Sequence, residues 1–370
     1  MARCKVCGST SRVVAGSLGV CRECIIARPE EARPYVDEAH RRARAPYPLP
    51  AFPPEDGLLC RRCGNACRIG AGERGYCGMV ENEGGRLRVL ATVDEGYLAC
   101  YYDWLPTNCV ASWVCPAETG VGYPQYAHSE GPEFGYKNLA VFYHSCTYDC
   151  LFCQNSHFRG RYLQGATSAA ELAAAVDDKT ACICYFGGDP TSQLEHSLAA
   201  SRMALREARR RGRILRVCWE TNGSMSPGGA RRVMDVALES GGCVKFDVKA
   251  ADENLNVALT GVSNRRTWEN LALLAEYIGR RPSPPPLVAS TLLVPGYVDE
   301  GEVAAIGRRL AALDENIPYS LLAFYPCHNM SDLPKTSREH AERCYRAAEE
   351  SGLKKIRLAN VHLLSPGDYG

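Results

Sequence analysis

From residue 139 onward, continuous apolar runs alternate with segments in which apolar residues recur every three to four positions. The runs predict strands at 139–143, 182–187, 214–220, 243–248, 287–293, 318–324 and 354–359. The periodic segments predict helices at 191–211, 227–240, 264–280, 299–313 and 336–351. Strands that alternate with helices pair in parallel, because each helix returns the chain to the same end of the sheet. The pattern therefore predicts an α/β protein.

Several helix ends carry capping residues. Ser168 with Glu171, and Thr336 with Glu339, each fit a capping box, in which each side chain satisfies the other residue's backbone N–H. The predicted carboxyl-terminal caps are the glycines at 212, 241 and 352.

Length and composition limit the possible classes of protein. The chain has 370 residues, enough for two or three domains, and 46% of them are hydrophobic. Its 43 basic and 42 acidic side chains create no global field for nucleic acid or an anionic membrane. No apolar segment approaches the roughly 20 residues that span a bilayer, and the first residues, Met1 to Lys5, lack a signal-peptide core. A cytoplasmic location is therefore expected.

The twenty cysteines change this picture, because their spacing favours metal ligands over disulfides. Two C-x2-C pairs within residues 1–28 have the layout of a zinc ribbon, with Cys4, Cys7, Cys21 and Cys24 as ligands. This segment has almost no apolar core, so a structural zinc ion is expected to fold it. Docking of nucleic acid or a protein partner is the alternative role.

A second group of cysteines follows a linker. Residues 29–56 predict a short helix and then a proline-rich stretch, 45–54, that would act as an extended spacer. Residues 57–136 form a second cysteine-rich domain, in which a C-x2-C-x3-C-x9-C array predicts a four-ligand site made of Cys60, Cys63, Cys67 and Cys77. Zinc is favoured there, and an iron–sulfur cluster is the alternative, because thiolates bind both.

Other cysteines have no clear ligand spacing. Cys100, Cys109 and Cys115 either bind another metal or are buried as small apolar side chains. Those on predicted strands are expected in the core: Cys182, Cys184, Cys218 and Cys243. Cys327 follows the strand at 318–324, so it is expected near the edge of the sheet that carries the chemistry, either as a hydrogen-atom donor or as a lining residue.

The most specific motif is C-x3-C-x2-C, formed by Cys146, Cys150 and Cys153 directly after the strand at 139–143. Three thiolates suit a four-iron cluster whose fourth iron stays open to a substrate. A structural zinc loop is the alternative, but zinc usually takes four ligands, and only His157 follows closely enough to be the fourth.

Downstream segments carry a family resemblance. Cys184-Tyr-Phe-Gly-Gly-Asp-Pro-Thr191, Trp219-Glu-Thr-Asn-Gly223, Lys245-Phe-Asp-Val-Lys249 and Leu259-Thr-Gly-Val-Ser263 follow the motif in order. Together they resemble the radical S-adenosylmethionine (SAM) superfamily, and within it the pyruvate formate-lyase activating enzyme branch. The array at 60–77 is similar to the amino-terminal segment of relatives associated with the AMMECR1 and Memo families.

The resemblance implies an incomplete (β/α)6 TIM-type barrel over residues 137–370, preceded by small cysteine-rich metal-binding domains. It implies a [4Fe–4S] cluster on Cys146, Cys150 and Cys153, shielded by Phe152. The remaining residues implied to bind SAM are Gly187, Gly188 and Asp189 at the methionyl end and Thr221, Asn222, Asp247 and Lys249 at the ribose and carboxylate. Asp189 stands where the family usually has Glu.

The resemblance also implies a reaction: reductive cleavage of SAM to a 5′-deoxyadenosyl radical, which removes hydrogen from a protein or other partner. An external donor such as ferredoxin or flavodoxin would supply the electron. One alternative is modification of a peptide or small molecule without a lasting radical. Another is a non-catalytic iron–sulfur or zinc protein that binds a partner or transfers electrons.

Overall fold

The protein is organised around one curved, mostly parallel sheet. The computed structural model describes residues 1–369. Within them the central sheet has nine strands in the order β15-β14-β13-β12-β11-β10-β8-β7-β9. Seven pair in parallel: β8 (Lys137–Tyr143), β10 (Thr180–Tyr185), β11 (Arg216–Thr221), β12 (Val244–Asp247), β13 (Leu287–Leu293), β14 (Tyr319–Ala323) and β15 (Ile356–Ala359). The predicted α/β fold is confirmed, and the sheet does not close into a full barrel.

One side of the sheet has an element that the sequence patterns did not predict. Strand β7 (Gly96–Trp104) pairs antiparallel with β8 over seven residue pairs, and also with the short β9 (Ala166–Thr167). In β7 the middle residues are exposed on both faces, so the strand lacks the apolar run that marks a buried parallel strand.

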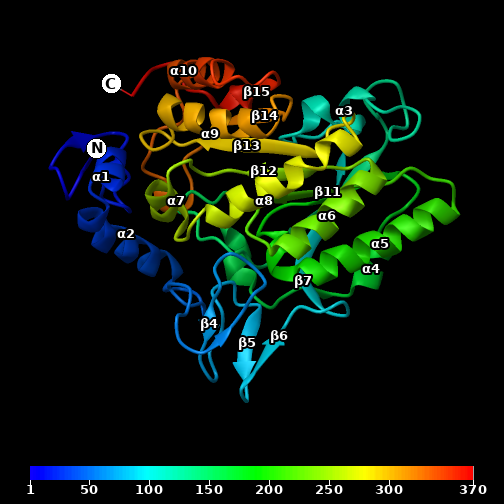
Figure 1. Ribbon diagram of the computed structural model, residues 1–370, viewed down its shortest axis with the longest axis horizontal. Coiled ribbons are helices and arrows are strands. Elements are labelled where there is room, and N and C mark those ends of the chain that lie inside the picture. Colours follow the sequence, from blue (N-terminus) through cyan, green and yellow to red (C-terminus); the bar gives the residue numbers. More distant parts are fainter. Residues whose placement is uncertain (370) are drawn as a thin grey trace.

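Helices connect the parallel strands and cover the outer face of the sheet (Figure 1). They are α4 (Ala169–Ala174), α5 (Leu194–Arg210), α6 (Pro227–Ser240), α7 (Glu253–Thr260), α8 (Arg265–Ala275), α9 (Glu300–Leu313) and α10 (Arg338–Glu349). Short 3-10 helices lie at 112–114, 156–161, 190–193, 278–280, 328–330 and 361–363.

The helix caps agree only partly with the prediction. The Ser168–Glu171 capping box is present at the start of α4. The predicted Thr336–Glu339 box is wrong, because Ser337 is the cap of α10 and its hydroxyl accepts from the backbone N–H of His340. Thr336 instead accepts a hydrogen bond from the N–H of Phe324 and donates one to the carbonyl oxygen of Leu293, which ties two strand ends together.

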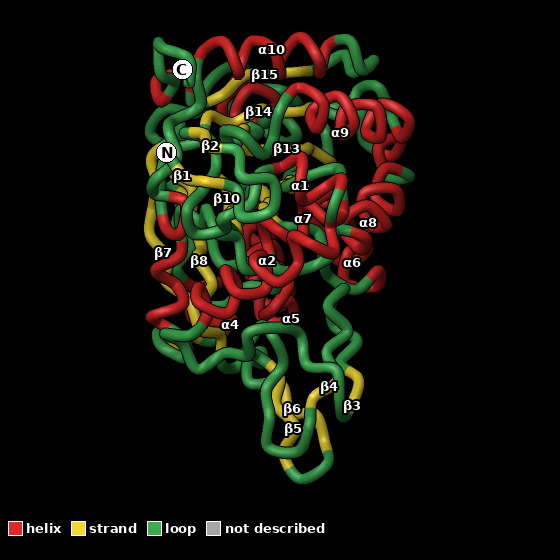
Figure 2. Tube along the Cα trace, turned by 90° about the vertical axis from the view of Figure 1, so that its left-hand side faces the viewer, coloured by secondary structure: helices red, strands yellow, loops and turns green. Residues whose placement is uncertain are grey.

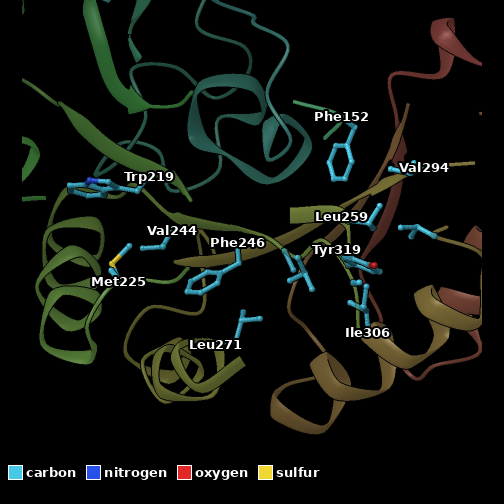
Figure 3. Close-up of a cluster of buried hydrophobic side chains, with 14 of the residues drawn as sticks. Phe152, Trp219, Met225, Val244, Phe246, Leu259, Leu271, Val294, Ile306 and Tyr319 are labelled. Atoms are coloured by element: carbon cyan, nitrogen blue, oxygen red, sulfur yellow. The ribbon is translucent and has the colours of Figure 1, made fainter. Parts of the chain in front are cut away.

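The core lies between the sheet and these helices. Figure 3 shows Phe246 of β12 facing Leu271 of α8, with Val244 on the same strand and Trp219 on the neighbouring β11. The cluster is continuous with apolar residues of the amino-terminal segment, among them Leu18, Ile25 and Val36. Residues 1–44 therefore share the hydrophobic core of the sheet.

The amino-terminal third contains one long helix, α2, and several short elements. They are β1 (Ala2–Arg3), β2 (Thr10–Ser11), α1 (Arg22–Ala27), α2 (Pro29–Arg44), β3 (Leu58–Leu59), β4 (Arg68–Ile69), β5 (Val80–Glu83), β6 (Arg86–Val89) and α3 (Pro116–Thr119). Figure 2 shows β3 to β6 projecting from the main body. The stretch 45–54 is not extended as predicted: its backbone turns, with the N–H of Tyr47 bonded to the carbonyl of Arg44.

Candidate active site

The cysteine motif lies in the loop after β8, at the carboxyl end of the sheet. The backbone N–H groups of Asp149 and Leu151 donate to the carbonyls of Thr260 and Leu259, at 2.8 and 3.0 Å. These bonds fix the loop to the end of α7. The three motif thiols thereby reach the same cavity, called here the rim cavity.

The rim cavity encloses about 960 Å³, including space open to solvent. Every residue that the resemblance assigned to the cluster or to SAM contributes to its wall: Cys146, Cys150, Phe152, Cys153, Gly187, Gly188, Asp189, Thr221, Asn222, Asp247 and Lys249. They come from the ends of β8, β10, β11 and β12, because parallel strands bring their carboxyl ends to one edge. The sequence did not single out Phe142, Tyr148 or Glu220, which also line the cavity.

Asp189 is buried and its carboxylate faces the protein. It accepts from the N–H of Thr191 at 2.7 Å, from the N–H of Asn222 at 2.7 Å and from the Thr221 hydroxyl at 2.9 Å. Burial raises the pKa of this carboxyl, and the hydrogen bonds oppose that rise. Its side chain thus orders the backbone of two neighbouring strand ends.

The two glycines allow close backbone packing. Gly188 has φ +63°, and a Cβ atom there would lie 2.0 Å from the carbonyl oxygen of Tyr143. At Gly187 a Cβ atom would lie 2.6 Å from the ring of Phe142. Only glycine fits the first position without movement of backbone.

Charged groups form another part of the wall. The Lys249 ammonium pairs with one Asp247 oxygen and lies 5.5 Å from the centre of the Phe152 ring. Burial lowers the pKa of Lys249, but Asp247 and the motif thiolates raise it more, so the net pKa is above that of an exposed lysine. The other Asp247 oxygen is buried and has no hydrogen-bond partner within residues 1–369. This leaves an acceptor for a ligand hydroxyl.

Cys327 lies beside the motif but outside the wall of the rim cavity, as far as residues 1–369 define that wall. Its thiol donates to the carbonyl oxygen of Phe152 at 3.2 Å, and burial raises its pKa to about 11. The neighbouring His328 has its pKa lowered to about 4 by burial and by Arg159, whose guanidinium lies 3.2 Å away. Cys327 is therefore a neutral thiol near pH 7.

A buried charge network behind the motif was not found from the sequence. Asp149, within the motif, is fully buried and lies 2.8 Å from Nδ1 of His40 and 2.7 Å from Arg159. The guanidinium of Arg44 is 3.8 Å away. His40 and Arg44 belong to α2, more than a hundred residues earlier in the chain, and no local pattern marks that contact. Asp149 alone could have been suspected from its place between two motif cysteines.

The amino-terminal cysteines form two further groups. Within residues 1–369 the only set of three or more candidate ligands with all ligand atoms within 4.8 Å of one another is Cys4, Cys7, Cys21 and Cys24. Zinc–sulfur bonds of about 2.3 Å place tetrahedral sulfurs roughly 3.8 Å apart, so this set suits a single ion. The second group shares a small pocket next to the motif: Cys60, Cys63, Cys67 and Cys77, with Thr147 in the same wall.

The donors at the rim fit the group that the resemblance implies. Three thiols without a fourth cysteine leave one iron of a four-iron cluster open. The Asp247 acceptor and the Gly188 turn, which no side chain could enter, provide a polar and closely approachable wall for SAM.

Comparison with known proteins agrees with this chemistry. Residues 140–306 match the family model described as the Radical SAM superfamily. These residues therefore form a radical SAM domain, and cleavage of SAM at an iron–sulfur cluster is general to that superfamily.

Among its relatives are isethionate sulfite-lyase activating enzymes. That of Nitratidesulfovibrio vulgaris is 36% identical over 147 residues, 38% of this chain and 43% of the relative. That of Oleidesulfovibrio alaskensis is 36% identical over 144 residues, 39% of this chain and 41% of the relative. The chain thus matches less than half the length of each.

Among the solved structures that the chain is similar to is a domain of a pyruvate-formate lyase-activating enzyme from Bacteroides vulgatus. It is 20% identical with a TM-score of 0.38, and the match covers 48% of this chain and 98% of that domain. Streptococcus suis SuiB bound to S-adenosylmethionine is 14% identical with a TM-score of 0.44, covering 59% of this chain and 49% of SuiB. No helix within residues 1–369 is both long and apolar enough to cross a membrane.

Proposed function

We propose that Cys146, Cys150 and Cys153 hold the [4Fe–4S] cluster and that the enzyme directs the resulting radical to a hydrogen atom of a protein or peptide. The observation that carries the proposal is the convergence of the three thiols and all eight residues assigned to the cofactor on one cavity. When bound, the reduced cluster and SAM supply a 5′-deoxyadenosyl radical.

The residues of the chain have separate tasks. The backbone at Gly187 and Gly188 approaches the methionyl end of SAM, and Asp189 fixes that backbone relative to Thr221 and Asn222. The free oxygen of Asp247 accepts from a ribose hydroxyl. Lys249 offers its ammonium group to the carboxylate and screens the charge of the thiolates.

A protein or peptide substrate is supported by an aromatic path that leads from the cavity to the surface. Phe142 and Phe186 line the cavity, and their ring centres are 5.7 Å apart. Tyr101 stacks on Phe142 at 5.5 Å and is 55% exposed. Exposed aromatic side chains are enriched where proteins bind protein partners. The names of the relatives, which are activating enzymes, agree with a protein substrate.

The first test is production of 5′-deoxyadenosine by the anaerobically reconstituted, chemically reduced protein in the presence of SAM. We expect product from the unaltered protein and none from Cys150→Ala. Cys344→Ala is the matched control, because this buried cysteine lies in α10 and lines neither the rim cavity nor the pocket beside it. If neither the unaltered protein nor the variants form product although the cluster is reduced, that result would favour a binding or electron-transfer protein instead.

The second test concerns the acceptor. Activation of a partner enzyme predicts a glycyl-type radical signal on a separate polypeptide in electron paramagnetic resonance (EPR) spectra. Modification of a peptide or small molecule predicts a stable mass change and no lasting radical. A gene for a glycyl radical enzyme in the same genome would favour the first outcome.

A further inference from the structure

The outer edge of β7 is open along most of the strand. In the central sheet β7 lies between β8 and β9, but β9 pairs only with Gly96 and Tyr97. Within residues 1–369, no strand lies against this edge between Ala99 and Trp104. Figure 2 shows β7 at the margin of the molecule, next to β8. The sheet therefore has a free edge beside the strand that leads into the cysteine motif.

The backbone groups of alternate residues point out of this edge. The N–H of Leu98 donates away from β8, to the carbonyl oxygen of Gly165 at 3.3 Å, directly before β9. This direction alternates along a strand, and the register of β7 with β8 is continuous. The N–H and carbonyl groups of Cys100, Tyr102 and Trp104 therefore also face away from β8. They form a row that no strand within residues 1–369 pairs with.

The side chains along the free edge are exposed on both faces of the sheet. Tyr101 is 55% exposed on the face of the rim cavity, where its ring stacks on Phe142. Tyr102 and Trp104 are 42% and 61% exposed on the opposite face. The ammonium group of Lys137, a residue of β8, lies 3.5 Å from the centre of the Tyr102 ring. This contact draws the Tyr102 ring over β8 and leaves the edge uncovered.

The free edge lacks the features that keep such edges unpaired. Natural edge strands are usually blocked by lysine, proline, a bulge or a covering segment. The run Leu98-Ala-Cys-Tyr-Tyr-Asp-Trp104 contains neither lysine nor proline, and its register with β8 is unbroken. Its one charged residue, Asp103, accepts a hydrogen bond from the Thr107 hydroxyl. An edge of this kind is a template for an extended chain, whose backbone satisfies a row of donors and acceptors.

The position of the free edge indicates what pairs with it. Strand β7 runs antiparallel to β8, which ends at Tyr143, directly before the motif loop. Phe142 lies opposite Ala99 in this register and lines the rim cavity. A chain paired with the edge therefore reaches the cavity across the rings of Tyr101 and Phe142. This continuity favours a substrate chain over a second copy of the protein, which would use the edge but not the cavity.

We propose that the free edge of β7 binds an extended segment of the protein or peptide substrate by β-strand addition. The inference rests on the proposed function, because it specifies how that substrate is held while a neighbouring residue enters the rim cavity. Backbone bonds to Cys100, Tyr102 and Trp104 supply affinity without requiring one sequence. The side chains of the segment alternate between the two aromatic faces, so apolar or aromatic residues are expected at every second position.

The test uses a proline that removes only an outward donor. Cys100→Pro deletes an N–H that does not bond to β8, and proline is tolerated at such edge positions. Cys100→Ala is the matched control, since it loses the same thiol but keeps the N–H. The probe is a phage-displayed library of random nine-residue peptides, the length of β7, selected on the unaltered protein. By fluorescence anisotropy, synthetic copies of the selected peptides should bind Cys100→Pro about tenfold more weakly and Cys100→Ala as tightly as the unaltered protein.

A second measurement needs no variant of the protein. Methylation of the backbone nitrogen of each peptide residue in turn should weaken binding at every second residue only, because alternate N–H groups of an added strand face β7. This scan decides if Cys100→Pro does not fold by circular dichroism. Equal binding by the two folded variants, the absence of any selected peptide, or a methylation scan without this alternation would overturn the proposal.

A second copy of the chain is the competing occupant of the edge. Dimers of the unaltered protein in analytical ultracentrifugation that Cys100→Pro abolishes would assign the edge to that copy and overturn the proposal. Peptide binding is measured without SAM or reductant. A failure to bind therefore refutes strand addition alone, whereas absence of 5′-deoxyadenosine in the cleavage assay refutes the proposed function.

Discussion

The buried carboxylate of Asp149 gives the sharpest test of how the motif loop is held. Asp149→Asn keeps the size of the side chain but removes the charge that faces His40, Arg44 and Arg159. All four side chains are at most 2% exposed. The variant therefore leaves buried guanidinium groups without their carboxylate.

Breaking one side of a buried ion pair costs about 3–5 kcal/mol, because the remaining charge stays desolvated. We expect the free energy of unfolding to fall by about that amount. We also expect faster loss of iron from the motif, since the loop between Cys146 and Cys150 loses its attachment to α2. The three ligands themselves are unchanged.

The assay is anaerobic urea unfolding followed by fluorescence, with iron release measured in parallel. Asp37→Asn is the matched control: Asp37 lies on α2, the helix of His40 and Arg44, and pairs with Arg33 at 2.7 Å, but the Arg33 side chain is 60% exposed. Such surface pairs contribute about 0–1 kcal/mol. A double-mutant cycle with His40→Gln should give a coupling of at least about 0.5 kcal/mol. If Asp149→Asn is no less stable than Asp37→Asn, the network does not hold the loop.

Three further predictions follow from other parts of the structure. Gly188→Ala should weaken SAM binding at least about tenfold by calorimetry, because the added Cβ meets the Tyr143 carbonyl, whereas Gly228→Ala, with open space around it, should bind normally. Cys7→Ser should lose one metal ion per chain by elemental analysis and make residues 1–44 more sensitive to limited proteolysis than in the unaltered protein. His328 binds a proton near pH 6.5 when unfolded but only near pH 4 when folded, so stability should fall as pH drops from 6.5 to 4. His328→Gln should flatten this decline in urea midpoints, and an unchanged slope would contradict the assignment.

Much of the fold could be predicted because its parallel strands are buried on both faces. Strand β10 is buried at every residue and reads as an apolar run, as such strands do. Helix α6 begins at Pro227 and ends at Ser240, as predicted, since Ser226 caps its start and Gly241 takes φ +80° at its end. Strand β7 escaped prediction because Tyr101 and Tyr102 are exposed and Cys100 and Asp103 do not alternate with apolar residues.

The candidate site, like the fold, could be predicted from the sequence only in part. Residues that share the rim cavity could be proposed from the family resemblance, and they meet because each follows a strand and parallel strands end at one edge. Contacts such as His40 with Asp149 could not, since they depend on how α2 packs against α7 rather than on any local pattern. The contact of Cys109 with Lys245 likewise depends on the path of the segment after β7, which only the folded structure shows.

The attachment of the amino-terminal segment has a consequence for biogenesis. The hydroxyl of Tyr297, after β13, donates to the carbonyl of Val20 at 3.0 Å and accepts from the N–H of Ala15 at 3.0 Å. Together with the His40 contact, this means that residues 1–44 must wait for strands made much later before they can dock. Under the proposed site assignments, metal loading at Cys4 precedes completion of the sheet, whereas iron insertion at Cys150 requires it. A shortage of the first metal would thus appear as poor iron incorporation, although the two metals share no ligand.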